Sequence, residues 1–84
     1  MITTEEIYNE VVQIFEDYDD KGRTIHVSSI DDNLYTDLGM DSLNVVEIVM
    51  LCEGRFNIHF EDEEIVFLHT VDDIVKIIYK NVNK

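Results

Sequence analysis

The chain has 84 residues, enough for one small domain with a single hydrophobic core, and we expect residues 1–84 to form that one domain. Nineteen Asp and Glu residues against six Lys and Arg residues give a formal net charge of −13, which argues against nucleic acid and anionic lipid as partners. One cysteine excludes an internal disulfide framework, and the lack of proline with only three glycines argues against a turn-rich β-fold.

The first predicted element is a helix that Thr3 or Thr4 caps at its N-terminus and that ends between Tyr18 and Asp20. Gly22 lies just beyond that end, where glycine often follows a helix. The apolar residues of this segment recur at spacings of three and four and form one stripe: Ile7, Val11, Ile14, Phe15 and Tyr18. A single apolar stripe is typical of a helix that packs against a core on one side.

Residues 19–36 form a connection that is long for a segment without structure of its own. Residues 24–28 alternate as a short strand would, but no second strand-like segment offers a partner, so we expect an ordered loop. Four apolar residues can hold this loop against the core: Ile25, Val27, Ile30 and Leu34.

The second helix is predicted over Ser42–Phe56. One of its faces is expected to lie in the core and carries Val45, Ile48, Val49, Cys52 and Phe56. A second face carries further apolar residues, Leu43, Val46 and Met50, together with Glu47. This apolar surface is wider than one core stripe requires, so we expect part of it to remain exposed.

The last third of the chain predicts a short helix and a longer one. A linker over residues 57–60 buries Ile58 or Phe60, and residues 61–67 form the short helix. Thr70 caps the last helix, whose apolar stripe contains Val71, Ile74, Val75, Ile78 and Val82. The sequence thus predicts an all-α fold, a small four-helix bundle with three longer helices, one short helix and a long ordered first loop.

Residues 17–22 resemble the start of an EF-hand loop, with acidic residues at the first and third positions and glycine at the sixth. However, Lys21 occupies a ligand position, and Ser28 stands where a bidentate Glu is needed. We therefore interpret this segment as a helix end followed by a solvated acidic turn.

Other candidate reactive residues do not form a recognisable site. His26, His59 and His69 lack metal-ligand spacing and do not cluster with Cys52. Cys52 lies on the apolar face of the second helix, so we expect an inert core thiol. The prediction is therefore a protein without catalytic residues and without a metal site.

The start of the second helix lies in a ten-residue motif, residues 34–43, which reads Leu-Tyr-Thr-Asp-Leu-Gly-Met-Asp-Ser-Leu. Because Asp41 and Ser42 are helix-starting residues, we expect the Ser42 hydroxyl on the surface at a helix N-terminus, a position that also favours phosphate. A plain N-cap is the alternative for Ser42. The capping box is incomplete, because Asn44 rather than Glu or Gln follows three residues after Asp41.

The motif closely resembles the attachment motif of the acyl carrier protein family, and the resemblance extends from about Ile7 to Asn81. It implies that Ser42 carries a 4′-phosphopantetheine arm, transferred from coenzyme A by a phosphopantetheinyl transferase. Asp41 is implied to cap the helix and to engage that transferase. The implied function is that of a non-enzymatic carrier, which holds acyl intermediates as thioesters on the arm in fatty acid, polyketide or related biosynthesis.

Two other functions remain open. The cargo is determined by the partners, so the protein could instead be an aminoacyl or peptidyl carrier of a specialised biosynthetic cluster. A function of another class is an acidic helical interaction module that never carries the arm.

The family resemblance also implies acyl-loading and acyl-processing partner enzymes with basic docking surfaces. Matched by position, the apolar contacts are Leu43, Val46 and Met50, and the acidic contacts are Glu47 and Glu53. The sequence departs from the common family pattern at Asn44 and at Gly54-Arg55, where acidic residues are frequent. This departure argues against interchange with the general enzymes of fatty acid synthesis.

Val66 and Phe67 of the short helix fall at positions that are usually polar and exposed in the family. If they lie next to Met50, the three side chains form an apolar partner surface. The alternative is that this short helix is rotated and that Phe67 fills the core.

We expect a monomer that works in the cytoplasm, without membrane insertion. The longest uninterrupted apolar stretch, residues 48–52, is far shorter than the ~20 residues of a membrane-spanning helix. The first six residues are acidic and do not form a signal-peptide pattern.

Overall fold

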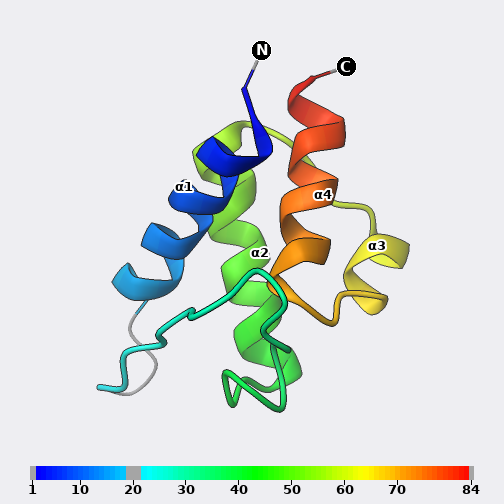
Figure 1. Ribbon diagram of the computed structural model, residues 1–84. Coiled ribbons are helices and arrows are strands. Elements are labelled where there is room, and N and C mark those ends of the chain that lie inside the picture. The colour runs from blue at the N-terminus through cyan, green and yellow to red at the C-terminus, as the bar shows by residue number, and fades with distance from the viewer. Residues whose placement is uncertain (1, 19–21, 84) are drawn as a thin grey trace.

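The computed structural model describes residues 2–18 and 22–83. Its helices, in chain order, are α1 (Thr4–Asp17), α2 (Ser42–Phe56), α3 (Asp62–Val66) and α4 (Val71–Val82). The three longer helices pack around one core, and the short α3 lies beside α4 (Figure 1). This arrangement confirms the predicted all-α bundle of three longer helices and one short helix.

Side-chain caps fix where the helices begin. Thr3 accepts a hydrogen bond from the backbone N–H of Glu6 at 3.1 Å, so Thr3 rather than Thr4 caps α1. Thr70 caps α4 in the same way, through the N–H of Asp73 at 3.2 Å. The bounds of α2 agree with the prediction, whereas α1 ends at Asp17, slightly earlier than predicted, and α3 is shorter than residues 61–67.

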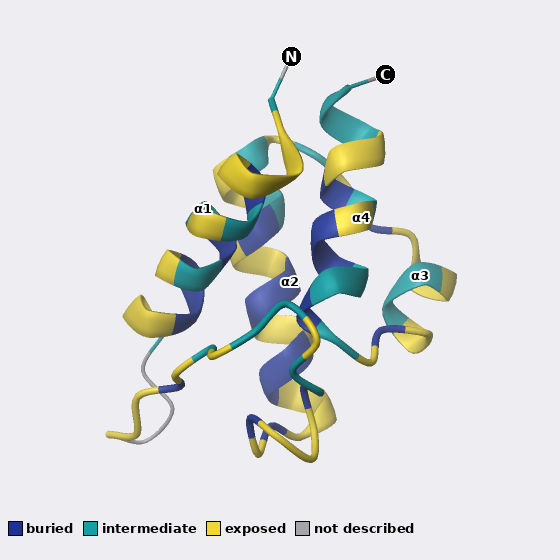
Figure 2. Cartoon of the chain, viewed as in Figure 1, coloured by how far each residue is buried: buried dark blue, intermediate teal, exposed yellow. Residues whose placement is uncertain are grey.

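One buried apolar face from each long helix forms most of the core, as Figure 2 shows by burial, and buried loop residues complete it. The predicted stripes of α1, α2 and α4 supply most of it, with Tyr18, Phe56 and Val82 only partly buried at its margin. Phe60 and Leu68, on either side of α3, are each 1% exposed, and they anchor that helix although none of its own residues is buried. The sequence left open whether Ile58 or Phe60 is buried in the linker. The structure buries Phe60, while Ile58 is only partly buried.

The described part of the first loop, from residue 22 onward, is ordered and contains no strand over residues 24–28. Ile25 and Leu34 are buried, while Val27 and Ile30 pack against the core with part of their surface exposed. Backbone hydrogen bonds also attach the loop to the start of α4, including Leu34 N–H to the His69 carbonyl at 2.8 Å. The loop is therefore held by the core and by the segment that precedes α4.

The two ends of the described chain lie together. Ile2 N–H donates to Asn83 Oδ1 at 3.3 Å, and Asn83 Nδ2 donates to the Ile2 carbonyl at 3.0 Å. Figure 1 places these ends at the opposite end of the bundle from the start of α2. Within the described residues, no helix is long and apolar enough to cross a membrane.

Candidate functional site

Ser42 is the first residue of α2, and its side chain is exposed. The N-cap is Asp41, whose Oδ1 accepts a hydrogen bond from Asn44 N–H at 2.8 Å. In return, Asn44 Oδ1 accepts a hydrogen bond from Asp41 N–H at 3.1 Å. The expectation of an incomplete capping box was therefore wrong, because the amide oxygen of Asn accepts the reciprocal bond that Glu or Gln usually accepts.

Because Asp41 is the N-cap of the completed capping box, the Ser42 side chain is not needed to cap α2. Among the described residues, the Ser42 hydroxyl has no hydrogen-bond partner, since Asp41 performs the capping. The hydroxyl is also next to the unpaired N–H groups and the positive dipole end of a 15-residue helix. An exposed alcohol in this position can be esterified, and a phosphate attached to it would be electrostatically favoured.

The turn before Ser42 is fixed from several sides. Leu38 and Met40 are buried, and Met40 N–H donates to the Leu34 carbonyl at 3.0 Å. Between them, Gly39 has φ +68°, a left-handed conformation that strains other residues. Arg23 Nη2 donates to the Gly39 carbonyl at 3.1 Å, so the first part of the loop holds the turn from outside.

Asn33 organises the earlier part of the motif. Its Oδ1 accepts from Tyr35 N–H at 2.9 Å and from Thr36 N–H at 3.0 Å, and its own N–H donates to Asp37 Oδ2 at 2.7 Å. These side-chain bonds replace regular secondary structure over the turn. Neither Asn33 nor Arg23 was predicted from the sequence, although Asn at the start of a Gly-containing turn segment is a usable signal for such bonding.

A side-chain network connects the end of α1 to the start of α2. Tyr18 donates its hydroxyl proton to Glu47 Oε1 at 2.6 Å and accepts a hydrogen bond from Asn44 Nδ2 at 3.1 Å. Asn44 is only 8% exposed. Asn44 is therefore a buried structural residue and does not occupy an exposed site from which a docking acid is missing.

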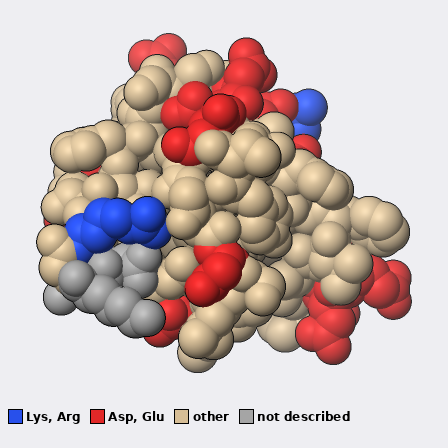
Figure 3. Space-filling model, turned by 90° about the horizontal axis from the view of Figure 1, so that it is seen from below, with Lys and Arg blue, Asp and Glu red and all other residues tan. Residues whose placement is uncertain are grey.

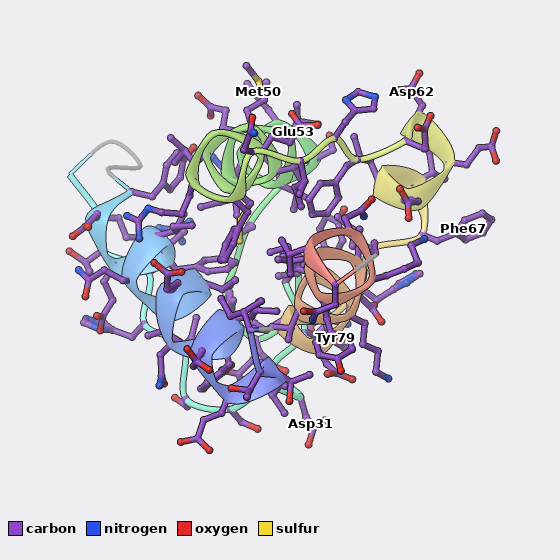
Figure 4. The ribbon with its side chains drawn as sticks, turned by 90° about the horizontal axis from the view of Figure 1, so that it is seen from above. Asp31, Met50, Glu53, Asp62, Phe67 and Tyr79 are labelled. Carbon is purple, nitrogen blue, oxygen red and sulfur yellow. The ribbon has the colours of Figure 1, made fainter. Side chains whose placement is uncertain are left out.

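The outer face of α2 brings together most of the predicted contact residues. Leu43 is 66% exposed, Met50 63% and Val46 39%, and Glu47 is exposed beside them. Figure 4 shows Met50 pointing outward from α2, away from the bundle. The prediction that part of this apolar surface stays exposed is confirmed.

The carboxylate of Glu53 contacts the segment after α2, whereas that of Glu47 contacts Tyr18 at the end of α1. One of its carboxylate oxygens, Oε2, accepts the Phe60 N–H at 2.8 Å and lies 3.2 Å from His59 Nδ1. The Glu53 carboxylate therefore stabilises the segment between α2 and α3. The Glu53 side chain is still 25% exposed and can contact a partner.

Val66 and Phe67 are 74% and 72% exposed, so the alternative that Phe67 fills the core was wrong. Leu68 enters the core instead. The shared patch with Met50 is also absent, because Phe67 points away from α2 on the far side of α3 (Figure 4). Phe67 instead lines a groove between α3 and α4, together with Glu63, Glu64, Leu68, Asp73, Lys76 and Ile77.

Cys52 is a buried free thiol, and burial raises its pKa to about 12. A thiol with such a pKa stays protonated and is a poor nucleophile near neutral pH. Of the calcium candidate at residues 17–22, residues 19–21 lie outside the described residues. Residues 2–18 and 22–83 contain no group of three or more metal-ligating side chains close enough to hold an ion.

The end of the bundle where α2 begins carries more acidic than basic side chains among the described residues. Figure 3, viewed from that side, shows several separate groups of Asp and Glu, while Lys and Arg of the described residues appear in only two places. A partner that approaches Ser42 from this side therefore meets a surface that favours basic and apolar side chains.

Comparison with known proteins identifies similar sequences over most of the chain. Residues 9–78 match the family model described as "Phosphopantetheine attachment site". An acyl carrier protein of Rickettsia bellii is 35% identical over 78 residues, which cover 93% of this chain and 88% of that relative. An acyl carrier protein of Wolinella succinogenes is 53% identical over 45 residues, but that match covers only 54% of this chain and 59% of the relative.

The fold is similar to that of a solved structure as well. The crystal structure of an acyl carrier protein from Thermotoga maritima superposes with a TM-score of 0.80 at 26% sequence identity. The match covers 95% of this chain and 91% of that chain. The overall fold is therefore common to both proteins.

Proposed function

Because the chain belongs to the acyl carrier protein family and contains its phosphopantetheine attachment domain, it is a non-catalytic carrier in acyl biosynthesis, and we propose that Ser42 is the attachment residue. The observation that supports this assignment most directly is the division of roles at the start of α2. Asp41 caps the helix, and the exposed Ser42 hydroxyl is left without a partner among the described residues. A hydroxyl in that position is accessible to a modifying enzyme.

The bound arm would supply a flexible thiol on which acyl groups are held as activated thioesters. The chain's own contribution is to present and position the attachment point. The N-terminal dipole of α2 favours the phosphate that links the arm to Ser42, and the buried Leu38 and Met40 fix the turn in front of it. Cys52, buried and protonated, does not compete with the thiol of the arm.

Partners are expected on the acidic and apolar surface around Ser42. A phosphopantetheinyl transferase attaches the arm, with Asp41 as a contact beside the serine. Acyl-loading and acyl-processing enzymes with basic surfaces then dock on the outer face of α2, at Leu43, Val46, Glu47, Met50 and Glu53. Val66 and Phe67 form a separate contact surface on α3. We further propose that the protein acts as a monomer in the cytoplasm.

Intact mass spectrometry tests the attachment site. The protein is incubated with coenzyme A and a phosphopantetheinyl transferase of broad specificity, alongside the variants Ser42→Ala and Ser28→Ala. Ser28 is exposed and outside the motif, so it serves as the matched control. The wild type and Ser28→Ala should gain one phosphopantetheine mass, and Ser42→Ala should gain none.

The fold of the test variant is checked by far-UV circular dichroism. Ser42→Ala should keep its helical signal, because Asp41 supplies the cap, and a Ser hydroxyl at a helix start contributes only about 1 kcal/mol even when it is the cap. A mass gain that persists in Ser42→Ala would disprove the assignment. No gain in the wild type with several transferases would favour an interaction module without the arm.

A further inference from the structure

The peptide group that joins Gly39 to Met40 is hydrogen-bonded at both ends. Its carbonyl oxygen, which belongs to Gly39, accepts a hydrogen bond from Arg23 Nη2 at 3.1 Å. Its N–H, which belongs to Met40, donates to the Leu34 carbonyl at 3.0 Å. Because a peptide group is planar and rigid, these two bonds together fix the orientation of the whole group.

The Arg23 guanidinium also lies directly against the backbone of Gly39. A Cβ placed on Gly39 would lie 3.1 Å from Arg23 Nη1 and 4.0 Å from Arg23 Cζ. One terminal nitrogen of the guanidinium therefore contacts the carbonyl oxygen, and the other lies where a side chain would begin. Glycine is needed here for two reasons, because it adopts φ +68° without strain and because it leaves room for the arginine.

Gly39 is the residue at which this turn has the most conformational freedom. Its neighbours Leu38 and Met40 are buried, whereas Gly39 is exposed and has no side chain to pack. Glycine adopts positive and negative φ about equally readily, so packing alone does not select one orientation of the following peptide group. The hydrogen bond from Arg23 therefore restrains the residue that the core does not hold.

The restrained peptide group is close to the proposed attachment residue. Gly39 is three residues before Ser42, so their Cα atoms are at most about 11 Å apart. Only Met40 and Asp41 lie between them, and Asp41 closes the capping box with Asn44. A rotation of the peptide group between Gly39 and Met40 would displace Asp41, and the Ser42 hydroxyl would move with it.

The contact of Arg23 differs from those of the other Lys and Arg residues that the structure describes. Each of the others pairs with a carboxylate outside residues 34–43: Arg55 with Glu10, Lys76 with Asp72, and Lys80 with Glu64. Arg23 instead donates to a backbone carbonyl inside that segment. Its role there is to hold the conformation of the turn.

We propose that Arg23 is a positioning residue for phosphopantetheine attachment, which holds the turn before Ser42 in the conformation that the transferase binds. This inference rests on the proposed function and extends it to a residue outside the ten-residue motif. Without the hydrogen bond from Arg23, a smaller fraction of the free protein has the competent conformation. The apparent affinity of the transferase for the carrier falls by that fraction, whereas the transfer step in the bound complex is unchanged.

The kinetic test compares Arg23→Gln and Arg23→Lys with the matched control Arg55→Gln. Both Gln variants remove one positive charge from an exposed arginine, but Arg55 contacts Glu10 and not the turn. Arg23→Gln should raise the KM for the carrier roughly fivefold, equivalent to a hydrogen bond of about 1 kcal/mol, with kcat and the KM for coenzyme A unchanged. Arg23→Lys keeps a charged donor and should restore most of the wild-type KM, and Arg55→Gln should behave as the wild type does.

Amide hydrogen exchange measures the turn itself, in unmodified protein and without the transferase. The Met40 N–H should exchange roughly fivefold faster in Arg23→Gln than in the wild type, because the peptide group has lost one of its two bonds. Amides inside α4 should exchange at the wild-type rate. The melting temperature should be the same in Arg23→Gln and Arg55→Gln, because both arginines are exposed.

Three results would overturn the assignment of Arg23. The first is a wild-type KM for the carrier in Arg23→Gln. The second is an equal rise of KM in Arg55→Gln, which would attribute the effect to net charge. The third is a higher KM with unchanged Met40 exchange, which would make Arg23 a direct contact of the transferase. Failure of the proposed function gives a different result, because the wild type would then gain no phosphopantetheine while Met40 exchange still reports the state of the turn.

Discussion

The hydroxyl of Tyr18 donates a 2.6 Å hydrogen bond to the carboxylate of Glu47. Tyr18 is the C-cap of α1, and Glu47 lies one turn into α2. The same hydroxyl accepts a bond from Asn44, which closes the capping box with Asp41. The end of α1 is therefore coupled through side chains to the helix start that presents Ser42.

Replacing Tyr18 by Phe should lower the free energy of unfolding by about 1–2 kcal/mol, because the hydrogen bond to the Glu47 carboxylate and the hydrogen bond from the Asn44 amide are both lost. Urea denaturation monitored by circular dichroism measures the difference. Tyr79→Phe is the control, since the Tyr79 hydroxyl makes no hydrogen bond within the described residues. Equal losses in the two variants would contradict a specific role for Tyr18.

Asn44→Asp should destabilise the protein by about 1–3 kcal/mol at pH 7, although the substitution restores an acid that is common in the family. The new carboxylate is buried next to Asp41 and can no longer donate to Tyr18. Thermal melting at pH 7 measures the loss, and Asn9→Asp on the exposed face of α1 is the control. A rise in melting temperature would show that the amide is not required.

The pKa of Glu64 is lowered, mainly by its hydrogen bond from Lys80 Nζ at 2.8 Å. A carboxyl with a lower pKa in the folded than in the unfolded protein stabilises above the unfolded pKa, and the contribution disappears as the pH falls through the folded value. Glu64→Gln should therefore cost about 0.2–1 kcal/mol at pH 7, as for exposed ion pairs, and nothing at the most acidic pH. The melting temperatures of the wild type and of Glu64→Gln, measured from pH 7 down to pH values below the pKa of Glu64, test this prediction. A difference between the two melting temperatures that does not change with pH would contradict it.

Cys52 should react slowly with iodoacetamide in the folded protein and rapidly after denaturation, because burial raises its pKa to about 12. Above pH 9, the unfolded thiol ionises while the folded thiol remains protonated, so stability should fall between pH 9 and 12. Cys52→Ala should lose this part of the pH dependence. Fast alkylation under native conditions would show that the thiol is accessible.

Changing Val66 to Glu and Phe67 to Lys together should leave the melting temperature unchanged, because both side chains are more than 70% exposed. If these residues contact a partner, acyl transfer by that partner should be slower. Leu68→Ala is the structural control: this neighbour is 1% exposed, and its truncation should cost about 2–5 kcal/mol. Unfolding of the double variant would contradict the exposure of Val66 and Phe67 in the structure.

The sequence predicted the helices well because periodicity and capping residues are local signals. The bounds of α2 were predicted correctly, since Asp41 and Ser42 begin the helix, and the left-handed Asn57 ends it. The capping box was misread for a local reason too, because the rule was applied to Glu and Gln although an Asn amide has the same acceptor.

The remaining features depend on contacts between distant parts of the chain. Arg23 reaches Gly39 across 16 positions and Tyr18 reaches Glu47 across 29, and neither spacing is visible in a periodic pattern. The direction of Phe67 depends on how α3 is rotated, and the buried residues on both sides of that helix, Phe60 and Leu68, determine the rotation. The family motif led to Ser42 as the proposed attachment residue, but it did not indicate these supporting contacts.

The pair of hydrogen bonds between Ile2 and Asn83 has a practical consequence for how the protein can be handled. Both ends meet at the opposite end of α2 from Ser42, and a 15-residue helix is about 22 Å long. A fluorescent label, a biosensor surface or a fused domain attached next to Ile2 or Asn83 would leave the serine facing outward. A short linker from Asn83 to Ile2 could also close this domain into a ring without stretching it, so that new ends could be opened elsewhere.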